Sequence, residues 1–354
     1  MTLGAIDKCL NNRFGLGAKF DEGFMTMGSL AIALIGMISF APVLANILKP
    51  ILLPVYSFLG TDPSVFATSI LANDMGGYAL AQKLAENPES GLFSGLILGS
   101  MMWATIVFTI PVAMGLIRKE DHKFFTIGII AGLITIPLGC FVAGLIAGFQ
   151  IPMLLSNLVP IVLISIILSI ALLRFPSKTM LGFAYFARAI VVLATLSTAA
   201  IVIETLTGLI IIPGMTPISE AIQTIWSITI ILIGAYPMIF IITKIWKKSL
   251  ARVGIYLGIN DVSTIGMIAS LANSIPMFGM IKDMDNKGKV LNVAFAVSAA
   301  FVFGDHLGFT AWVNKEMIFP VIVWKLIAWL SAIILANFLI KKNKWLILED
   351  IVEC

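Results

Sequence analysis

Two ionisable residues stand side by side inside one of the most apolar stretches of this sequence. The run FGDHLGF, residues 303–309, contains Asp305 and His306, and His306 is one of only two histidines in the chain. A second acidic residue, Asp74, follows Asn73 in the run LANDMGG. Two carboxylates with an imidazole can hold a cation, pass a proton or act as acid and base.

Composition places these groups inside a membrane. The chain has 354 residues, of which 59% are hydrophobic and 12% are charged, whereas soluble domains average about 45–50% and about 25%. We therefore predict an integral membrane protein that has the lipid bilayer as a partner and does not bind nucleic acid. The three widely spaced cysteines form neither a disulfide framework nor a zinc signature, and we expect no metal and no cofactor.

Apolar runs long enough to cross a bilayer, which takes roughly 20 residues, recur along the chain. The fold class that we predict is therefore an all-α polytopic membrane protein. The candidate spans cover about 24–48, 92–117, 124–148, 152–173, 179–207, 219–243, 290–313 and 317–340.

Two further apolar segments, 62–84 and 261–281, are interrupted midway, the first by Asp74–Gly77 and the second by Asn273–Pro276. Glycine and proline release backbone hydrogen-bonding groups, and a break at membrane depth is tolerated only inside protein or beside water. We interpret both segments as broken re-entrant hairpins. When both return to the side that they entered, most of the 23 basic residues lie on one face, which the positive-inside rule makes cytoplasmic.

The two broken segments belong to an internal repeat. The order LIG, LG and LAN begins at residues 34, 59 and 71 and recurs at 232, 257 and 271. Related halves that together enclose a site are typical of transporters. We therefore predict a single transmembrane domain, 1–354, with repeat A at about 24–148, repeat B at about 219–340 and linking helices at about 152–207. In this topology the repeats are inverted, and the hairpin tips meet near the membrane midplane.

A charge at the bilayer centre costs roughly 2.5–3.5 kcal/mol on insertion scales, so the acids in apolar runs are candidates for function. We predict a site for an organic cation formed by Asp74, Asp305 and His306, with the repeat-related amides Asn73 and Asn273. Aromatic faces also attract cations, and the candidates are Tyr78, Trp103, Phe303, Phe309 and Trp312. In the structural alternative, Asp305 and His306 bond only each other or cap a broken helix.

Three other charges lie within the predicted spans. Arg188 and Glu204 share one run and stand too far apart to pair within a helix. Glu204 lies near the outer end of its span and Lys325 about two turns into the last span, so we expect each to extend its side chain along the helix and reach water.

Several long motifs carry a resemblance to a known family. They include LANDMGGYALAQKLA, SLANSIPMFGMIKDMDNKGK and AFVFGDHLGF, and the similarity extends from about Leu3 to Ile340. On these residues the chain resembles the bacterial ethanolamine-utilisation transporter family. The resemblance implies uptake of ethanolamine across the bacterial inner membrane, to feed an ammonia-lyase pathway in the cell. Members of the family usually open with a further apolar helix, which implies that this chain begins partway through it.

Residue chemistry and resemblance together give one hypothesis. Asp74 and Asp305 would hold the ammonium of ethanolamine, Asn73 and Asn273 would bond its hydroxyl or fix the hairpin tips, and His306 would bond Asp305. Access to the site would alternate between the two sides of the membrane.

Other interpretations stay open at this stage. The same substrate could diffuse through a channel-like facilitator, or the chain could be a gate-type permease for another small solute such as a nucleoside. An enzyme is disfavoured because a single intramembrane histidine offers neither a metal cluster nor a nucleophile. The oligomeric state is open, with a homodimer as the working expectation.

Overall fold

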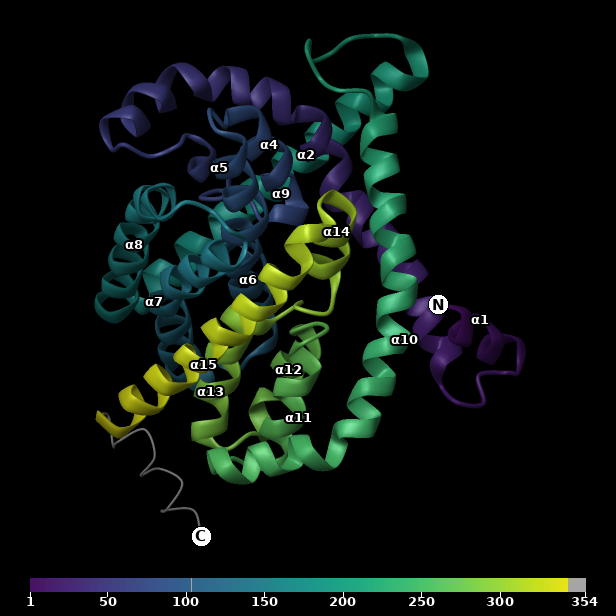
Figure 1. The fold of residues 1–354 in the computed structure, drawn as a ribbon, viewed down its shortest axis with the longest axis vertical. Coiled ribbons are helices and arrows are strands. Elements are labelled where there is room, and N and C mark those ends of the chain that lie inside the picture. Colours follow the sequence, from purple (N-terminus) through teal and green to yellow (C-terminus); the bar gives the residue numbers. More distant parts are fainter. Residues whose placement is uncertain (103, 343–354) are drawn as a thin grey trace.

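The computed structural model describes residues 1–102 and 104–342, which form helices and their connections without any strand (Figure 1). Seven helices of this described part are long and apolar enough to cross a membrane. The prediction of an all-α multi-pass membrane protein is therefore confirmed. The seven are Leu16–Phe58, Pro88–Leu116, Lys119–Ile146, Ile151–Arg174, Pro176–Thr207, Ile218–Ile241 and Lys315–Lys342.

The first part of the chain consists of a short helix, a long helix, a broken hairpin, an irregular span and a continuous helix. Its broken hairpin has two short helices separated by a 3₁₀ turn at Asn73–Met75. The span after the hairpin is also irregular, because π-helical and 3₁₀ turns lie between its two α-helical ends. The helices are α1 (Thr2–Cys9), α2 (Leu16–Phe58), α3 (Ser64–Ala67), α4 (Gly77–Leu84), α5 (Pro88–Leu92), α6 (Ile110–Leu116) and α7 (His122–Ile146).

After two linking helices, the same order of elements returns: a long helix, a broken hairpin, a broken span and an unbroken helix. Figure 1 shows α4 in the upper half of the molecule and α11 with α12 in the lower half. The inverted relation of the repeats stays a prediction. The helices are α8 (Ile151–Arg174), α9 (Pro176–Thr207), α10 (Ile218–Leu257), α11 (Asp261–Ser270), α12 (Ile275–Met280), α13 (Asn286–Ala299), α14 (Asp305–Val313) and α15 (Ile318–Lys342).

The long helix α2 extends well beyond the predicted span. Its 43 residues correspond to about 65 Å at 1.5 Å per residue, about twice the thickness of a bilayer core. Figure 1 shows its second half turning across one end of the molecule. Three prolines, Pro42, Pro50 and Pro54, lie inside this helix, and proline is a usual cause of such bending.

The prediction of one continuous span over 290–313 is wrong. Helix α13 ends at Ala299 and α14 begins at Asp305, and between them Phe301 adopts a positive φ of 61°. Two of the backbone N–H groups that this break releases have hydrogen-bond partners in the second hairpin. Phe301 donates to the carbonyl of Ser270 at 3.2 Å, and Phe303 donates to that of Leu271 at 3.0 Å. The end of α11 in the second hairpin therefore stabilises the break.

One aspartate ties the neck of each hairpin. Asp62 accepts the backbone N–H of Ser64 at 2.8 Å and that of Asn87 at 3.0 Å, which joins the entrance of the first hairpin to its exit. In the second hairpin, Asp285 accepts the N–H of Asn260 at 2.9 Å and that of Gly288 at 3.0 Å. Each aspartate thus closes the base of its hairpin.

Helix α13 is buried on nearly every side, and two of its valine side chains lie directly over glycines of α7. A Cβ atom on Gly132 would lie 2.4 Å from the side chain of Val297, and one on Gly128 would lie 2.5 Å from that of Val293. Such close approach requires glycine, because proteins pack at nearly crystalline density and larger residues would separate the helices. This contact fixes α13, and with it the start of the broken segment.

The ion pair between Asp121 and Lys289 should stabilise the same helix pair. Its N···O distance is 2.6 Å, and the side chains are 3% and 13% exposed. Asp121→Asn should lower the free energy of unfolding in detergent by about 3 kcal/mol, because it leaves a largely buried ammonium unpaired. The double variant Asp121→Asn/Lys289→Met should recover part of this loss. The exposed Glu120 supplies the control, since Glu120→Gln should change stability by less than about 0.5 kcal/mol. Equal effects of the two single variants would contradict a structural role for the buried pair.

Candidate functional site

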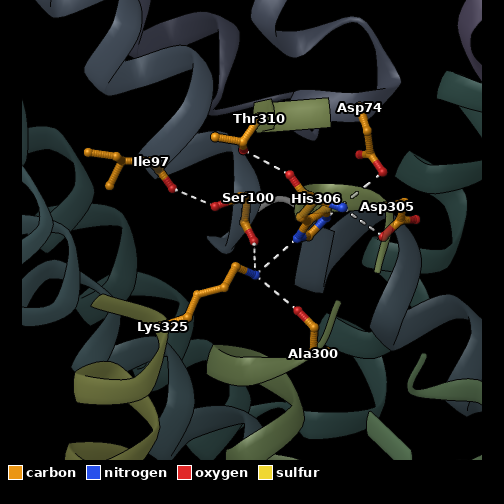
Figure 2. Close-up of polar contacts among 8 residues, drawn as sticks. All are labelled: Asp74, Ile97, Ser100, Ala300, Asp305, His306, Thr310 and Lys325. Carbon is orange, nitrogen blue, oxygen red and sulfur yellow. Dashed lines mark hydrogen bonds and ion pairs between the residues drawn. The ribbon is translucent and has the colours of Figure 1, made fainter. Parts of the chain in front are cut away.

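A buried chain of polar contacts joins α15, α14 and the tip of the first hairpin (Figure 2). The Nζ atom of Lys325 lies 3.0 Å from Nδ1 of His306, and Nε2 of His306 lies 3.9 Å from Oδ2 of Asp74. His306 and Lys325 lie on successive helices, whereas Asp74 comes from the other half of the chain. The imidazole therefore bridges a buried cation and a carboxylate.

Asp305 completes the cluster. Its carboxylate accepts the backbone N–H of His306 at 3.0 Å, and it lies in the first turn of α14, where the helix dipole favours negative charge. One potential ligand atom from each of Asp74, Asp305 and His306 lies within 4.8 Å of the others. The structure thus brings together the three ionisable residues that the sequence singled out.

The tip of the first hairpin positions Asp74 through a glycine. The 3₁₀ turn Asn73–Met75 ends at Gly76, which has a φ of +86°. A Cβ there would lie 2.7 Å from Cβ of Met37 on α2. Both the left-handed backbone and the contact with α2 require glycine at this position. The hairpin tip that carries Asp74 therefore packs closely against the long helix α2.

Asp74, Asp305 and His306 face a cavity of about 240 Å³, called here the central cavity. Asn273, from the tip of the second hairpin, lines it as well, so both hairpin tips reach the same space. Its remaining walls come from α2, α10, both hairpins and both broken spans. They are formed by Thr26, Ser29, Leu30, Ala72, Met75, Ala104, Phe108, Tyr236, Ile275 and Phe301.

Asn73 and Tyr78, two further residues of the predicted site, lie elsewhere. They line a second cavity of about 360 Å³ together with Gly76, Phe309 and Trp312. The rings of Tyr78 and Phe309 meet edge to face at 5.6 Å. The amide of Asn73 is fully buried, and neither of its polar atoms has a hydrogen-bond partner within the described ranges 1–102 and 104–342. Trp103, the last predicted residue, lies outside the described residues.

The expectation for Lys325 is wrong. This residue does not extend to water, because it is only 1% exposed. Its ammonium donates to the carbonyl of Ser100 at 3.0 Å and to that of Ala300 at 2.9 Å (Figure 2). These carbonyls lie at the breaks of the two irregular spans, where the helix no longer satisfies them. The sequence shows how far Lys325 lies along its helix but not which face it occupies, and that face decides its role.

Neither Arg188 nor Glu204 lines the central or the second cavity. Two carboxylates and an imidazole at such short separations are also a set that a divalent metal could use. From the sequence we expect this site to hold no metal, and that expectation stays a prediction. Chemically, the cluster can hold either a metal ion or an organic cation.

Comparisons with known proteins give a consistent result. The family model described as "Ethanolamine utilisation protein, EutH" matches residues 1–339. A protein of Listeria monocytogenes named "Probable ethanolamine permease EutH" is 56% identical over 348 residues, which are 97% of this chain and 93% of the relative. Proteins of Salmonella typhimurium and Escherichia coli with the same name are 46% and 47% identical, over 93% of this chain and 86% of each relative. No solved structure matches.

The approach of the second hairpin to α14 can be tested at Gly304. A Cβ at this position would lie 2.4 Å from the carbonyl oxygen of Ala272. Gly304→Ala should therefore push Asn273 away from Asp305 and destabilise the protein in detergent by about 2 kcal/mol. Gly279→Ala is the matched control, because a Cβ there meets no atom within 4 Å. Equal thermal unfolding midpoints for the two variants would show that the contact is looser than described.

Proposed function

Because the chain belongs to the EutH family of ethanolamine utilisation proteins, we propose that it transports protonated ethanolamine across the bacterial inner membrane. The observation that carries the proposal is the pair Asp74 and Asp305, which face one small cavity inside the apolar part of a multi-pass membrane protein. Acids at membrane depth are costly and are typical of ion and substrate pathways. A transporter accounts for them without a chemical reaction.

The ammonium end of ethanolamine fits the carboxylates. An ammonium group has three N–H donors and no acceptor, and charge-assisted bonds to carboxylates are stronger than neutral ones. Each carboxylate has two acceptor oxygens, and both Asp74 and Asp305 line the central cavity. The carboxylates thereby replace the water that the ammonium loses on leaving solution.

The hydroxyl end can be bonded by polar groups elsewhere in the cavity wall. Thr26 donates its own hydroxyl hydrogen to the carbonyl of Gly23 at 2.6 Å, so its oxygen is left to accept a hydrogen bond. Asn273 accepts the N–H of Ile275 through Oδ1 at 2.9 Å, which leaves its NH₂ group to donate. One acceptor and one donor match a hydroxyl, which is both donor and acceptor.

Size and aromatic surface further favour a small organic cation. The central cavity, at about 240 Å³, lies below the range of roughly 300–1,000 Å³ that is common for pockets of drug-sized ligands. This argues against a nucleoside. The rings of Phe108, Tyr236 and Phe301 line the cavity, and aromatic faces attract ammonium groups.

Alternating access is the mechanism that we favour over a fixed pore. The central and second cavities share no lining residue. Successive residues of the first hairpin tip divide between them, with Asp74 and Met75 on the central cavity and Asn73 and Gly76 on the second. A tip that lies between two cavities supports a model in which it moves to connect the substrate with one side at a time.

Neutralising either acid should abolish most transport. Asp74→Asn and Asp305→Asn in proteoliposomes should each reduce uptake of radiolabelled ethanolamine at least about 10-fold, since a hydrogen bond to a charged group contributes about 1.5–3 kcal/mol. Asp283→Asn, at an exposed position beyond the second hairpin, should retain normal uptake. Normal uptake by both cavity variants would refute this substrate site.

Carrier and channel can be separated by counterflow. Proteoliposomes loaded with unlabelled ethanolamine should transiently accumulate external label above its equilibrium level. An alternating carrier that has carried unlabelled ethanolamine out returns with labelled ethanolamine bound. The uptake rate should also saturate with concentration. Label that only rises to equilibrium, at a rate proportional to its concentration, would instead indicate a channel-like facilitator.

A further inference from the structure

Lys325 places its side-chain nitrogen beside the central cavity. Its ammonium contacts three acceptors in the described part of the chain, namely the carbonyls of Ser100 and Ala300 and Nδ1 of His306. A protonated lysine has three N–H donors, so these contacts satisfy it fully. The side chain does not line the cavity and reaches it only through the imidazole.

This cation sets the net charge of the site. Asp74 and Asp305 are close enough to repel each other strongly when both are ionised, and a buried pair of like charges requires a nearby opposite charge. With Lys325 protonated, His306 neutral and both carboxylates ionised, the cluster carries one net negative charge. One alkylammonium ion neutralises it, whereas a divalent metal would leave one uncompensated positive charge in an apolar interior.

Lys325 also controls what His306 can do. When Nδ1 accepts a hydrogen bond from the ammonium, the proton of the neutral imidazole must lie on Nε2. Nε2 is the nitrogen that faces Asp74 at 3.9 Å. A protonated ring nitrogen cannot ligate a metal, because metal binding needs its lone pair. The lysine therefore turns a potential metal ligand into a hydrogen-bond donor toward the carboxylate of Asp74.

From these contacts we infer that Lys325 is the specificity-determining residue that restricts this site to monovalent organic cations and prevents binding of divalent metal ions. The inference rests on the proposed function, since it concerns which cations the same cavity accepts. It further implies that removal of the lysine charge creates a metal site from Asp74, Asp305 and His306.

The experiment is a zinc titration of the purified full-length protein in detergent, without ethanolamine. Wild-type protein should show no Zn²⁺ binding that depends on His306. Lys325→Gln should bind Zn²⁺ about 10-fold or more tightly than wild type. The change removes a positive charge that would repel Zn²⁺, and the new amide oxygen can accept a hydrogen bond from Nδ1–H, which leaves the lone pair of Nε2 for the metal. Binding is measured by calorimetry and by the rise in unfolding temperature with Zn²⁺.

Paired variants identify the site of binding. Lys325→Gln/His306→Gln should lose the gained affinity, while Lys341→Met, at the far end of the same helix, should behave as wild type. Zn²⁺ binding to wild-type protein that disappears in His306→Gln would overturn the inference, whether or not the Lys325 variant folds. So would a folded Lys325→Gln protein that gains no affinity.

A direct binding assay with labelled ethanolamine separates this inference from the proposed function. If wild-type protein binds no ethanolamine while Lys325→Gln gains His306-dependent zinc binding, the transport proposal fails and the role of Lys325 in excluding metal stands. If wild-type protein binds ethanolamine and Lys325→Gln binds zinc no more tightly than wild type, the transport proposal stands and the role of Lys325 in excluding metal fails.

Discussion

Every helix that breaks inside a membrane must find partners for the backbone groups that it releases, and this protein is organised around that requirement. An unpaired carbonyl or N–H in hydrocarbon costs several kcal/mol. The carbonyls of Ser100 and Ala300, at the breaks of two spans, are bonded by the single ammonium of Lys325. The N–H groups of Phe301 and Phe303 are bonded by the end of α11. The breaks thus stabilise one another across both halves of the chain.

The same requirement brings charge into the interior. Once a lysine is placed there to bond carbonyls, its positive charge must be balanced, and the carboxylates of Asp74 and Asp305 lie in the same cluster, beside His306. His306 lies between the basic and the acidic group, with Nδ1 toward Lys325 and Nε2 toward Asp74. Structural and binding roles are therefore difficult to separate in this cluster. A residue that holds a break together also decides the charge that the cavity presents.

Much of the fold could be predicted from the sequence because membrane spans depend on local properties. Length and apolarity located α7, α8, α9 and α15 to within a few residues, and glycine with proline located both hairpin breaks. The break after Ala299 escaped because AAFVF is apolar and contains no proline. It forms because a neighbouring hairpin accepts its N–H groups, which is a tertiary effect that no local pattern reveals.

The cluster could be predicted in part for a similar reason. Asp74, Asp305 and His306 stood out because each is expensive in apolar surroundings. Lys325 carries the same signal but was assigned to the membrane surface, since a long side chain near a helix end usually reaches water. Depth along a helix follows from the sequence, whereas the face that a residue occupies depends on what packs against it.

The division of the hairpin tip between two cavities follows from its geometry. A 3₁₀ turn advances by about 120° per residue, so its successive side chains project in different directions. Asp74 and Met75 face the central cavity, whereas Asn73 faces the second cavity. Sequence adjacency suggested one site for Asn73 and Asp74, yet the turn that positions the acid directs its neighbour elsewhere. The tip of the first hairpin therefore lines both cavities, each with different side chains.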